Sequence, residues 1–466
     1  MGYIDQSKLF DMAHQVQEWL RLACEYGRED RAEEVYAKVK EALLGAAAEL
    51  EHMEPEASLA AKEPDDLDAI KALRPEGPRK LKLPGDVELA DRMAGAVLGR
   101  FAGCLLGVPV EGYSTADLQD MARLCGMEYP PVDYWTNVRY PERVQYGVSP
   151  RKVYTRDGMD GVAVDDDITY SILGLLILEK YGPDFTTADV GAYWKDYLPY
   201  ACTAEHVALE NLKAGVSAEK AGEVNNPYQQ WIGADIRSDP WGWACAGNPE
   251  KAAEYAWRDA YLSHRRNGIY GEMFFAAAQA AAFSVDSPEE AIRIGLTEIP
   301  TECTLAKDVE WALEKAPEVK NWEDARKLVD ERFAGMNAVH TNNNACLTIF
   351  GLILGNKDYT KTIGEVIAMG LDNDCTGATA GSVLGGVIGL KNIPAHWTKN
   401  FNNKVFTYIK GSEELALDEA YTRLDNRMNE LTGAILESGY GKAARARWGD
   451  GFVERYEVNS KLNSPE

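Results

Sequence analysis

The sequence predicts an all-α protein, and three observations support this fold class. Small and aliphatic residues gather in helix-length blocks, the first of which covers 89–106. Segments in which β-branched and polar residues alternate between tight turns, as strands require, are scarce. Runs of alanine such as 276–282 allow helix axes to approach closely. We therefore predict a compact bundle of many helices.

The N-terminal elements precede this bundle. Apolar residues recur with the spacing of one helix face from Leu9 to Ala23 and again from Ala32 to Leu43, which predicts a helical hairpin over 1–50. Residues 51–86 contain five prolines among charged residues, so they interrupt helix and offer little apolar surface to bury. We expect this stretch to be a linker.

The remaining residues, 87–466, are predicted to form one helical domain. Blocks of helix length and high apolar content lie at 89–106, 168–181, 252–264, 271–283, 345–354 and 378–390. The sequence shows no internal repeat at a fixed period.

Composition narrows the classes of partner. The chain has 466 residues, of which 45% are hydrophobic and 26% charged, so it can bury a sizeable core and is not a disordered protein. Its net charge of 49 − 74 = −25 repels phosphate backbones and anionic lipid surfaces. No apolar run approaches the ~20 residues of a membrane-spanning helix. We expect neither nucleic acid nor a membrane as a partner.

The cysteines point to a reducing compartment. The eight cysteines are scattered along the chain, and none of them forms a Cys-x-x-Cys pair. This distribution fits reduced thiols better than a disulfide framework. The N-terminus turns acidic at Asp5 and lacks the apolar core of a signal peptide. We expect a cytoplasmic location.

The most informative motif is a run of three carboxylates, Asp165, Asp166 and Asp167, directly before the apolar stretch from Ile168. One aspartate explains an N-cap, and acidic residues favour the first turn of a helix. Three crowded carboxylates at the edge of a core repel one another unless protons or a cation compensate them. A metal site and a solvated acidic cap both remain open for this motif.

A second acidic motif follows about two hundred residues later. Asp372 and Asp374 flank Asn373 and again lead into a helix of small residues. Two carboxylates in alternation suit one hard cation, and oxygen ligands without histidine favour Mg²⁺, Mn²⁺ or Ca²⁺ over Zn²⁺. The alternative is a turn with an N-cap.

A third segment, 99–112, combines glycines with a glutamate. Gly99 and Gly103 are four residues apart, which permits close helix packing. Glu111 follows the break at Pro109 and is available as a further acidic ligand.

Together the three segments resemble the ADP-ribosylglycohydrolase family, over roughly residues 87–400. Members share a Gly-rich first helix that ends in Glu, a Thr-Asp-Asp-Thr motif and a Gly-Gly-Asp-Thr-Asp-Thr motif. The resemblance implies an orthogonal all-α bundle with two Mg²⁺ ions in a cleft, for which Mn²⁺ is the alternative. The implied ligands are Glu111, Asp165, Asp166, Asp167, Asp372 and Asp374.

Two positions depart from the family motifs. Ile168 stands where the first Asp motif ends in Thr, and Cys375 stands where the second has a metal-contacting Thr. A thiol is a poor Mg²⁺ ligand. Asp165, which replaces the first Thr, could compensate, or the site could hold one metal; both interpretations stay open.

Substrate contacts are expected from the middle of the chain, where it departs further from the founding hydrolases. Asn267 and Tyr270 lie in one such segment, and His340 and Asn343 lie where the family places sugar-contacting groups. A structural histidine and an Asn N-cap are the alternatives for the last two. Four tryptophans, at 231, 241, 243 and 257, could form an aromatic wall or pack in the core, and the group 235–239 could be a structural ion pair.

The resemblance implies a Mg²⁺-dependent hydrolysis of a ribosyl or related N- or O-glycosidic bond, with Asp166 and Asp167 as the catalytic pair. Sugar hydroxyls would be oriented at the metals while an Asp deprotonates the attacking water. The divergent middle segment favours a small nucleoside or sugar conjugate as the substrate. The alternatives are removal of ADP-ribose from protein side chains and a non-catalytic scaffold.

Overall fold

The computed structural model describes residues 3–4, 7–51 and 53–417. This part contains 19 α-helices and four strands of two or three residues, which confirms the predicted all-α class. The strands form two small antiparallel pairs: β1 (Val144–Gln145) with β2 (Ser149–Pro150), and β3 (Lys404–Phe406) with β4 (Glu414–Ala416).

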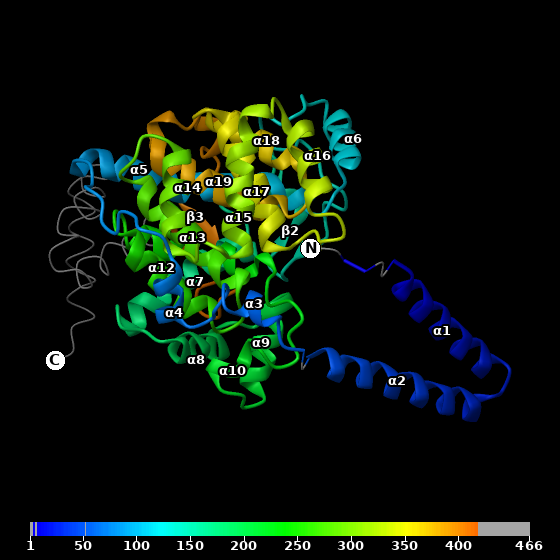
Figure 1. Cartoon of the computed structure of the whole chain (residues 1–466). Coiled ribbons are helices and arrows are strands. Elements are labelled where there is room, and N and C mark those ends of the chain that lie inside the picture. The colour runs from blue at the N-terminus through cyan, green and yellow to red at the C-terminus, as the bar shows by residue number, and fades with distance from the viewer. Residues whose placement is uncertain (1–2, 5–6, 52, 418–466) are drawn as a thin grey trace, which may run out of the picture.

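Helices make up most of the described chain, and the longest stretch between two of them, residues 126–165, carries β1 and β2 (Figure 1). The first ten are α1 (Ser7–Glu25), α2 (Glu29–Glu51), α3 (Ala57–Ala60), α4 (Leu67–Leu73), α5 (Asp86–Gly107), α6 (Thr115–Cys125), α7 (Asp166–Tyr181), α8 (Thr187–Tyr197), α9 (Thr203–Lys213) and α10 (Ala218–Ala221). The others are α11 (Asp239–Ala244), α12 (Pro249–Ala260), α13 (Asn267–Ala282), α14 (Pro288–Gly295), α15 (Thr304–Lys315), α16 (Trp322–Arg332), α17 (Thr341–Gly355), α18 (Tyr359–Met369) and α19 (Asn373–Ile388). The six predicted helices correspond to α5, α7, α12, α13, α17 and α19.

Helices α5 and α19 pack in antiparallel directions with their backbones in direct contact. A Cβ atom on Gly103 would lie 2.0 Å from the carbonyl oxygen of Gly377, and one on Gly95 would lie 2.4 Å from that of Gly385. Only glycine allows so close an approach, which confirms that the glycines of α5 serve helix packing. Because the two helices are antiparallel, the end of α5 meets the start of α19.

Contrary to the expectation from the sequence, the segment Asp86–Val110, which contains α5, is long and apolar enough to cross a membrane by length and hydropathy alone, with a mean hydropathy of 1.6 in its most apolar stretch. All of that stretch is buried inside the protein. Its apolar character is therefore explained by its place at the centre of the bundle.

The N-terminal helices α1 and α2 form a hairpin that projects away from the bundle, as the dark blue ribbon in Figure 1 shows. Ala32 is buried where the two helices meet near the turn. The body of the protein leaves most of the hairpin surface uncovered.

Residues 51–86, which we expected to be a linker, pack closely on the bundle over much of their length. Ile70 of α4 is fully buried in the core, and the Glu63 side chain is 0% exposed. Arg74 forms ion pairs with Glu250 and Glu298, both at 2.5 Å. The prolines do limit the helices to short turns, but the residues between them have buried partners that are distant in sequence. The other end of the predicted domain, 418–466, lies outside the described residues.

Candidate metal centre

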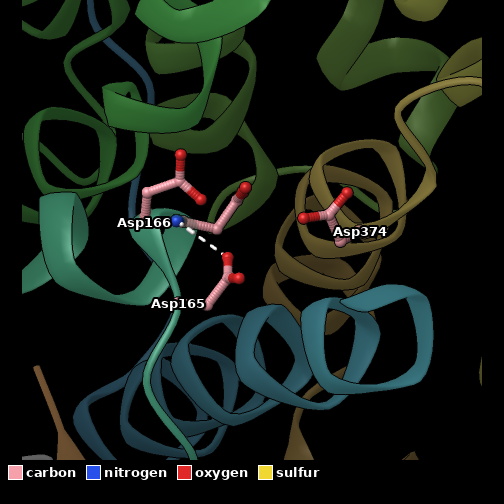
Figure 2. A group of neighbouring side chains, drawn as sticks. Asp165, Asp166 and Asp374 are labelled. Carbon is pink, nitrogen blue, oxygen red and sulfur yellow. Dashed lines mark hydrogen bonds between the residues drawn. The ribbon is translucent and has the colours of Figure 1, made fainter. Parts of the chain in front are cut away.

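Carboxylates from three separate segments converge at the junction of α5, α7 and α19. They form two groups that share Asp374, and within each group one oxygen per carboxylate lies within 4.8 Å of the others. The first group comprises Asp165, Asp166, Asp167 and Asp374; the second comprises Glu111, Asp372 and Asp374. Figure 2 shows Asp165 and Asp166, before and at the start of α7, facing Asp374 at the start of α19. The structure thus brings together all six residues expected as metal ligands.

Helix starts hold most of these side chains. Asp165 is the N-cap of α7, and its Oδ1 accepts a hydrogen bond of 3.0 Å from the backbone N–H of Asp167. The capping interpretation therefore accounts for this one aspartate. Asp372 is the N-cap of α19, but its side chain makes no capping hydrogen bond. The positive ends of two helix dipoles point at the cluster and favour its negative charge.

Burial and mutual repulsion shift the acidity of the cluster. The pKa values of Asp165 and Asp374 lie well above the usual range, first because both are buried and then because carboxylates surround them. Asp374 Oδ1 has no hydrogen-bond partner among the described residues. Glu111 as a whole residue is exposed, but protein atoms crowd its carboxylate; the resulting loss of hydration, followed by the charges of Asp372 and Asp166, raises its pKa to about 8. Burial raises the pKa of Asp372 to about 6. A divalent cation would remove this repulsion, and oxygen ligands suit it, so the residues fit such an ion.

Arg100 is a fully buried partner of the cluster that the sequence analysis did not identify. Its guanidinium pairs with Asp167 at 2.8 Å and with Asp239 at 2.5 Å. It also donates to Ser171 Oγ at 2.8 Å. Arg100 is the only charged residue between Met93 and Gly107, and this was the signal that could have found it, because an isolated buried charge requires partners.

Other side chains orient individual carboxylates. Tyr146 donates its hydroxyl hydrogen to Asp166 Oδ1 at 2.8 Å, and the Cys104 thiol lies 3.4 Å from Asp165 Oδ1. The backbone N–H of Asp372 donates to Asn344 Oδ1 at 3.2 Å. These partners are distant in sequence from the acids they hold, so no local spacing could reveal them.

The two departures from the family motifs are both buried. Ile168 is 0% exposed and belongs to the apolar core, so it offers no ligand atom. Burial and the surrounding carboxylates raise the pKa of Cys375, which keeps it a neutral thiol. Cys375 belongs to neither acidic group. Carboxylate oxygens therefore supply the donors in both groups.

Five of the six carboxylates, all except Asp165, line a cavity of about 650 Å³. Its walls include Tyr146, Tyr170 and Tyr200 together with Trp231 and the carboxylate of Glu205. A volume in this range suits a small molecule of nucleoside or sugar size. Hydroxyl-bearing aromatic rings provide both apolar faces and hydrogen-bonding groups for such a ligand.

Glu205 of α9 is held in the cavity wall by Arg237, whose Nη1 lies 2.6 Å from Glu205 Oε1. Arg237 also pairs with Asp259 at 2.5 Å and with Glu272 at 3.4 Å, so one positive charge serves three carboxylates. Burial is the main reason that the pKa of Glu205 is raised to about 7, against the opposing effect of Arg237. A Cβ atom at Gly233 would lie 2.2 Å from the Glu205 carboxylate, so glycine there allows its placement.

Asn267 and Tyr270, expected to bind substrate, are occupied by the segment before α4, and neither lines the cavity. Asn267 Nδ2 donates to Glu63 Oε2 at 3.0 Å, and the Tyr270 hydroxyl donates to the carbonyl oxygen of Pro64 at 2.6 Å. The structure therefore gives both side chains partners within this chain, away from the cavity. The polar pattern was real, but its partners belong to this chain.

His340 and Asn343 stabilise a loop next to the cavity and do not line it. His340 is the N-cap of α17, its Nδ1 accepting from the N–H of Asn342 at 3.2 Å, and burial lowers its pKa to about 4. Asn343 Nδ2 donates to the carbonyl oxygen of Asn337 at 2.9 Å. The structural alternative explains both residues, and Val339 of this loop reaches the cavity.

Among the aromatic and charged residues of the middle segment, some are buried in the core and others line the cavity. Trp241 and Trp243 are buried in the core, whereas Trp231 lines the cavity. Asp235, which we considered for an ion pair, is buried with both carboxylate oxygens lacking a hydrogen-bond partner among the described residues. Burial holds the pKa of its carboxyl group well above the usual range.

Comparison with known proteins agrees with the motifs. A family model described as ADP-ribosylglycohydrolase matches residues 86–430, which is 345 of 466 residues. The search of curated proteins gave no match. A solved structure titled "ADP-ribosylglycohydrolase-related protein complex" shares 19% identity at a TM-score of 0.43, with 66% of this chain and 92% of that chain covered. The chain therefore belongs to the ADP-ribosylglycohydrolase family, a family of glycohydrolases.

Proposed function

We propose that the protein is a Mg²⁺-dependent glycohydrolase that cleaves a ribosyl or related N- or O-glycosidic bond of a small nucleoside or sugar conjugate. The observation that carries this proposal is the convergence of six carboxylates, five of which line a cavity of about 650 Å³. Two Mg²⁺ ions are proposed there, with Mn²⁺ as the alternative. We also propose a cytoplasmic location, supported by eight free cysteines.

The charge of the cluster supports two divalent ions. Six carboxylates contribute −6, and Arg100 is balanced by its second partner, Asp239. Two ions add +4, which leaves −6 + 4 = −2 before a ligand binds. A net negative site stabilises the positive charge that develops on a sugar ring during glycosidic cleavage.

The proposed roles of the side chains follow from their exposure and partners. When bound, the metal ions would orient vicinal hydroxyls of the sugar and polarise them. Asp166 is partly exposed in the cavity, so we assign it the role of the base that takes a proton from the attacking water. Asp167 is buried against Arg100, and we assign it to holding the ligand cluster in place.

Glu205 is proposed to protonate the leaving group. It lines the same cavity as Asp166, and a pKa raised to about 7 keeps it largely protonated in mildly acidic solution. As the bond between the anomeric carbon and the leaving atom breaks, the electron pair goes to that atom together with the Glu205 proton. The oxygen of water forms the new bond to carbon and loses its proton to Asp166.

The pH dependence of turnover tests this assignment. A carboxyl group with a pKa of about 7 loses its proton as the pH rises, so we expect kcat to fall above about pH 7. Glu205→Gln should lower kcat by about 10²–10⁴-fold and remove this alkaline decline. The matched control is Glu210→Gln on the exposed face of the same helix. An unchanged alkaline decline in Glu205→Gln would exclude Glu205 as the acid.

The second candidate is an ADP-ribosyl-protein hydrolase, which one observation favours. Arg143, next to β1, lines the cavity and could contact a diphosphate. The family acts on ADP-ribosylated substrates, which makes ADP-ribose a suitable probe for both candidates. A non-catalytic scaffold is the third possibility, and turnover separates it from the other two.

Titration of the metal-stripped protein is the experiment that tests the proposal. We expect Mg²⁺ and Mn²⁺ to bind in calorimetry and to create a site for ADP-ribose or a free riboside. Hydrolysis of p-nitrophenyl riboside, nucleosides and ADP-ribosylated peptide, each with and without EDTA, then identifies the substrate class. No metal uptake at millimolar concentration would reject the metal-dependent mechanism, and metal uptake without any turnover would favour a scaffold.

A further inference from the structure

The N-terminal hairpin has an apolar surface that the body of the protein does not cover. In Figure 1, α1 and α2 diverge from their tip back toward the bundle, and the tip is far from it. Contacts with the body occur at the two bases. Tyr3 packs next to Gly335, and Glu51 Oε1 accepts a hydrogen bond of 2.7 Å from the N–H of Asn225.

Both helices repeat apolar residues at alternating steps of three and four. In α1 and the residue that follows it, these apolar positions are 9, 12, 16, 19, 23 and 26. In α2 and the residues that follow it, they are 32, 36, 39, 43, 46, 50 and 53. This is the spacing by which helices pack side by side in bundles and coiled coils. We call the row of apolar positions along each helix a seam. Two helices alone bury only part of their two seams, so the pattern indicates that further helices pack against the hairpin.

The exposed side chains confirm that the seams are only partly used. Twelve of the twenty large apolar side chains exposed in the described residues lie within 3–53, a tenth of the chain. Phe10 is 80% exposed, Trp19 69% and Tyr26 72%. A concentration of this kind on one projection marks an interaction surface.

The area available is enough for a stable dimer. Among the repeat positions, the three aromatic residues Trp19, Tyr26 and Tyr36 are 57–72% exposed, which corresponds to roughly 300–500 Å² at 150–250 Å² per ring. Five aliphatic side chains at these positions, each about 60% exposed, add roughly 200–350 Å². The sum of roughly 500–850 Å² per copy compares with about 800 Å² per partner in a standard interface.

We propose that this hairpin binds the same hairpin of a second copy of the chain and forms an antiparallel four-helix bundle. In a two-fold symmetric pair, the exposed apolar positions of one hairpin pack against the same positions of the other. Two copies therefore form a closed dimer without any other component. An antiparallel crossing of the two α2 helices near Tyr36 brings Glu33 of each copy toward Lys40 of the other. The charges that flank the seam are therefore complementary in this arrangement.

Because the hairpin projects from the body, two copies can pair through it with little electrostatic repulsion between their bodies. Each chain carries a net charge of −25, which opposes contact between the bodies. The 19 residues of α1 extend about 28 Å, whereas the Debye length at physiological salt is about 8 Å. Contact through the hairpins keeps the acidic bodies apart by more than the screening length.

The molar mass of the full chain in solution tests the proposal. Light scattering after gel filtration should give 2 × 51.5 = 103 kDa for the wild type and 51.5 kDa for the double variant Trp19→Glu/Leu43→Glu. Both side chains are exposed, so the variant keeps the contacts within the hairpin. Circular dichroism should show an unchanged melting transition of the bundle in the monomeric variant.

Leu124→Glu is the matched control, because Leu124 is 76% exposed but lies on the body, and it should remain a dimer. A wild-type mass of 51.5 kDa up to high micromolar concentration would overturn the proposal, and would indicate that another protein or another segment of this chain fills the seams. A double variant that stays at 103 kDa would also overturn it, since the interface would then lie elsewhere.

Discussion

Asp374→Asn is expected to abolish metal-supported ligand binding and to lower turnover at least 100-fold. Asp374 is the carboxylate shared by both acidic groups, so its replacement removes a charged ligand from each. The amide keeps the shape of the side chain, and the loss of one buried like charge should leave the folded state no less stable. Calorimetric titration with Mg²⁺, followed by turnover with the substrate found as above, measures both effects.

Asp358→Asn provides the matched control for this substitution. Asp358 is the N-cap of α18 and accepts a hydrogen bond of 2.9 Å from the N–H of Lys361, at the opposite end of this helix from the acidic motif at Asp372. Asparagine caps helices about as well as aspartate, so stability and metal affinity should not change. Metal affinity that is unaffected in Asp374→Asn would contradict the assignment of Asp374 as a shared ligand.

Arg100→Met is expected to cause the largest loss of stability, about 3–5 kcal/mol. Arg100 is fully buried, and its removal leaves the carboxylates of Asp167 and Asp239 without their positive partner. Methionine fills much of the space but supplies no charge or donor. Urea unfolding of the metal-stripped protein measures the change as a shift of the midpoint.

The pH dependence of that loss identifies its cause. In the wild type, the charge of Arg100 lowers the pKa values of Asp167 and Asp239, which burial raises. Without Arg100, both pKa values rise further above their values in the unfolded chain. Such groups favour folding while they are protonated, and the favourable contribution is lost as the pH rises through the raised pKa. The difference between the wild type and Arg100→Met should therefore be smaller at pH 5 than at pH 8.

Arg139→Met is the control for the loss of an arginine. Arg139 is about half exposed and pairs with Asp117 at 3.6 Å, so its replacement should cost less than about 1 kcal/mol. If Arg100→Met costs no more than this control, or if its cost does not vary with pH, the buried ion pairs are not what stabilises this part of the core.

The helices and the acidic ligands could be predicted because their signals are local. The apolar blocks in α5, α7 and α19 follow the helical period, and a row of aspartates before a buried helix is visible in any few adjacent residues. The link between the end of α5 and the start of α19 was also present, as glycines four residues apart on both helices. These local patterns did not reveal which other helix each helix packs against.

The partners of charged and polar residues could not be predicted for that reason. Glu63 and Asn267 are 204 positions apart and hydrogen-bonded, yet each alone looked like a solvent-facing or ligand-binding residue. Glu205 has a raised pKa because folding removes it from water, and the nearby charge of Arg237 offsets this only in part; no residue adjacent in sequence reveals either effect.

The sequence by itself determined the helical class, the family and the six acidic side chains, since each depends on the order of neighbouring residues. The tertiary structure alone decided that Arg100 pairs with Asp167, that Glu205 faces the cavity and that Glu63 and Pro64 occupy Asn267 and Tyr270, which were expected to contact substrate. Those outcomes depend on which distant segments meet, and charge and hydrogen bonding act over a few ångströms in space whatever the separation along the chain.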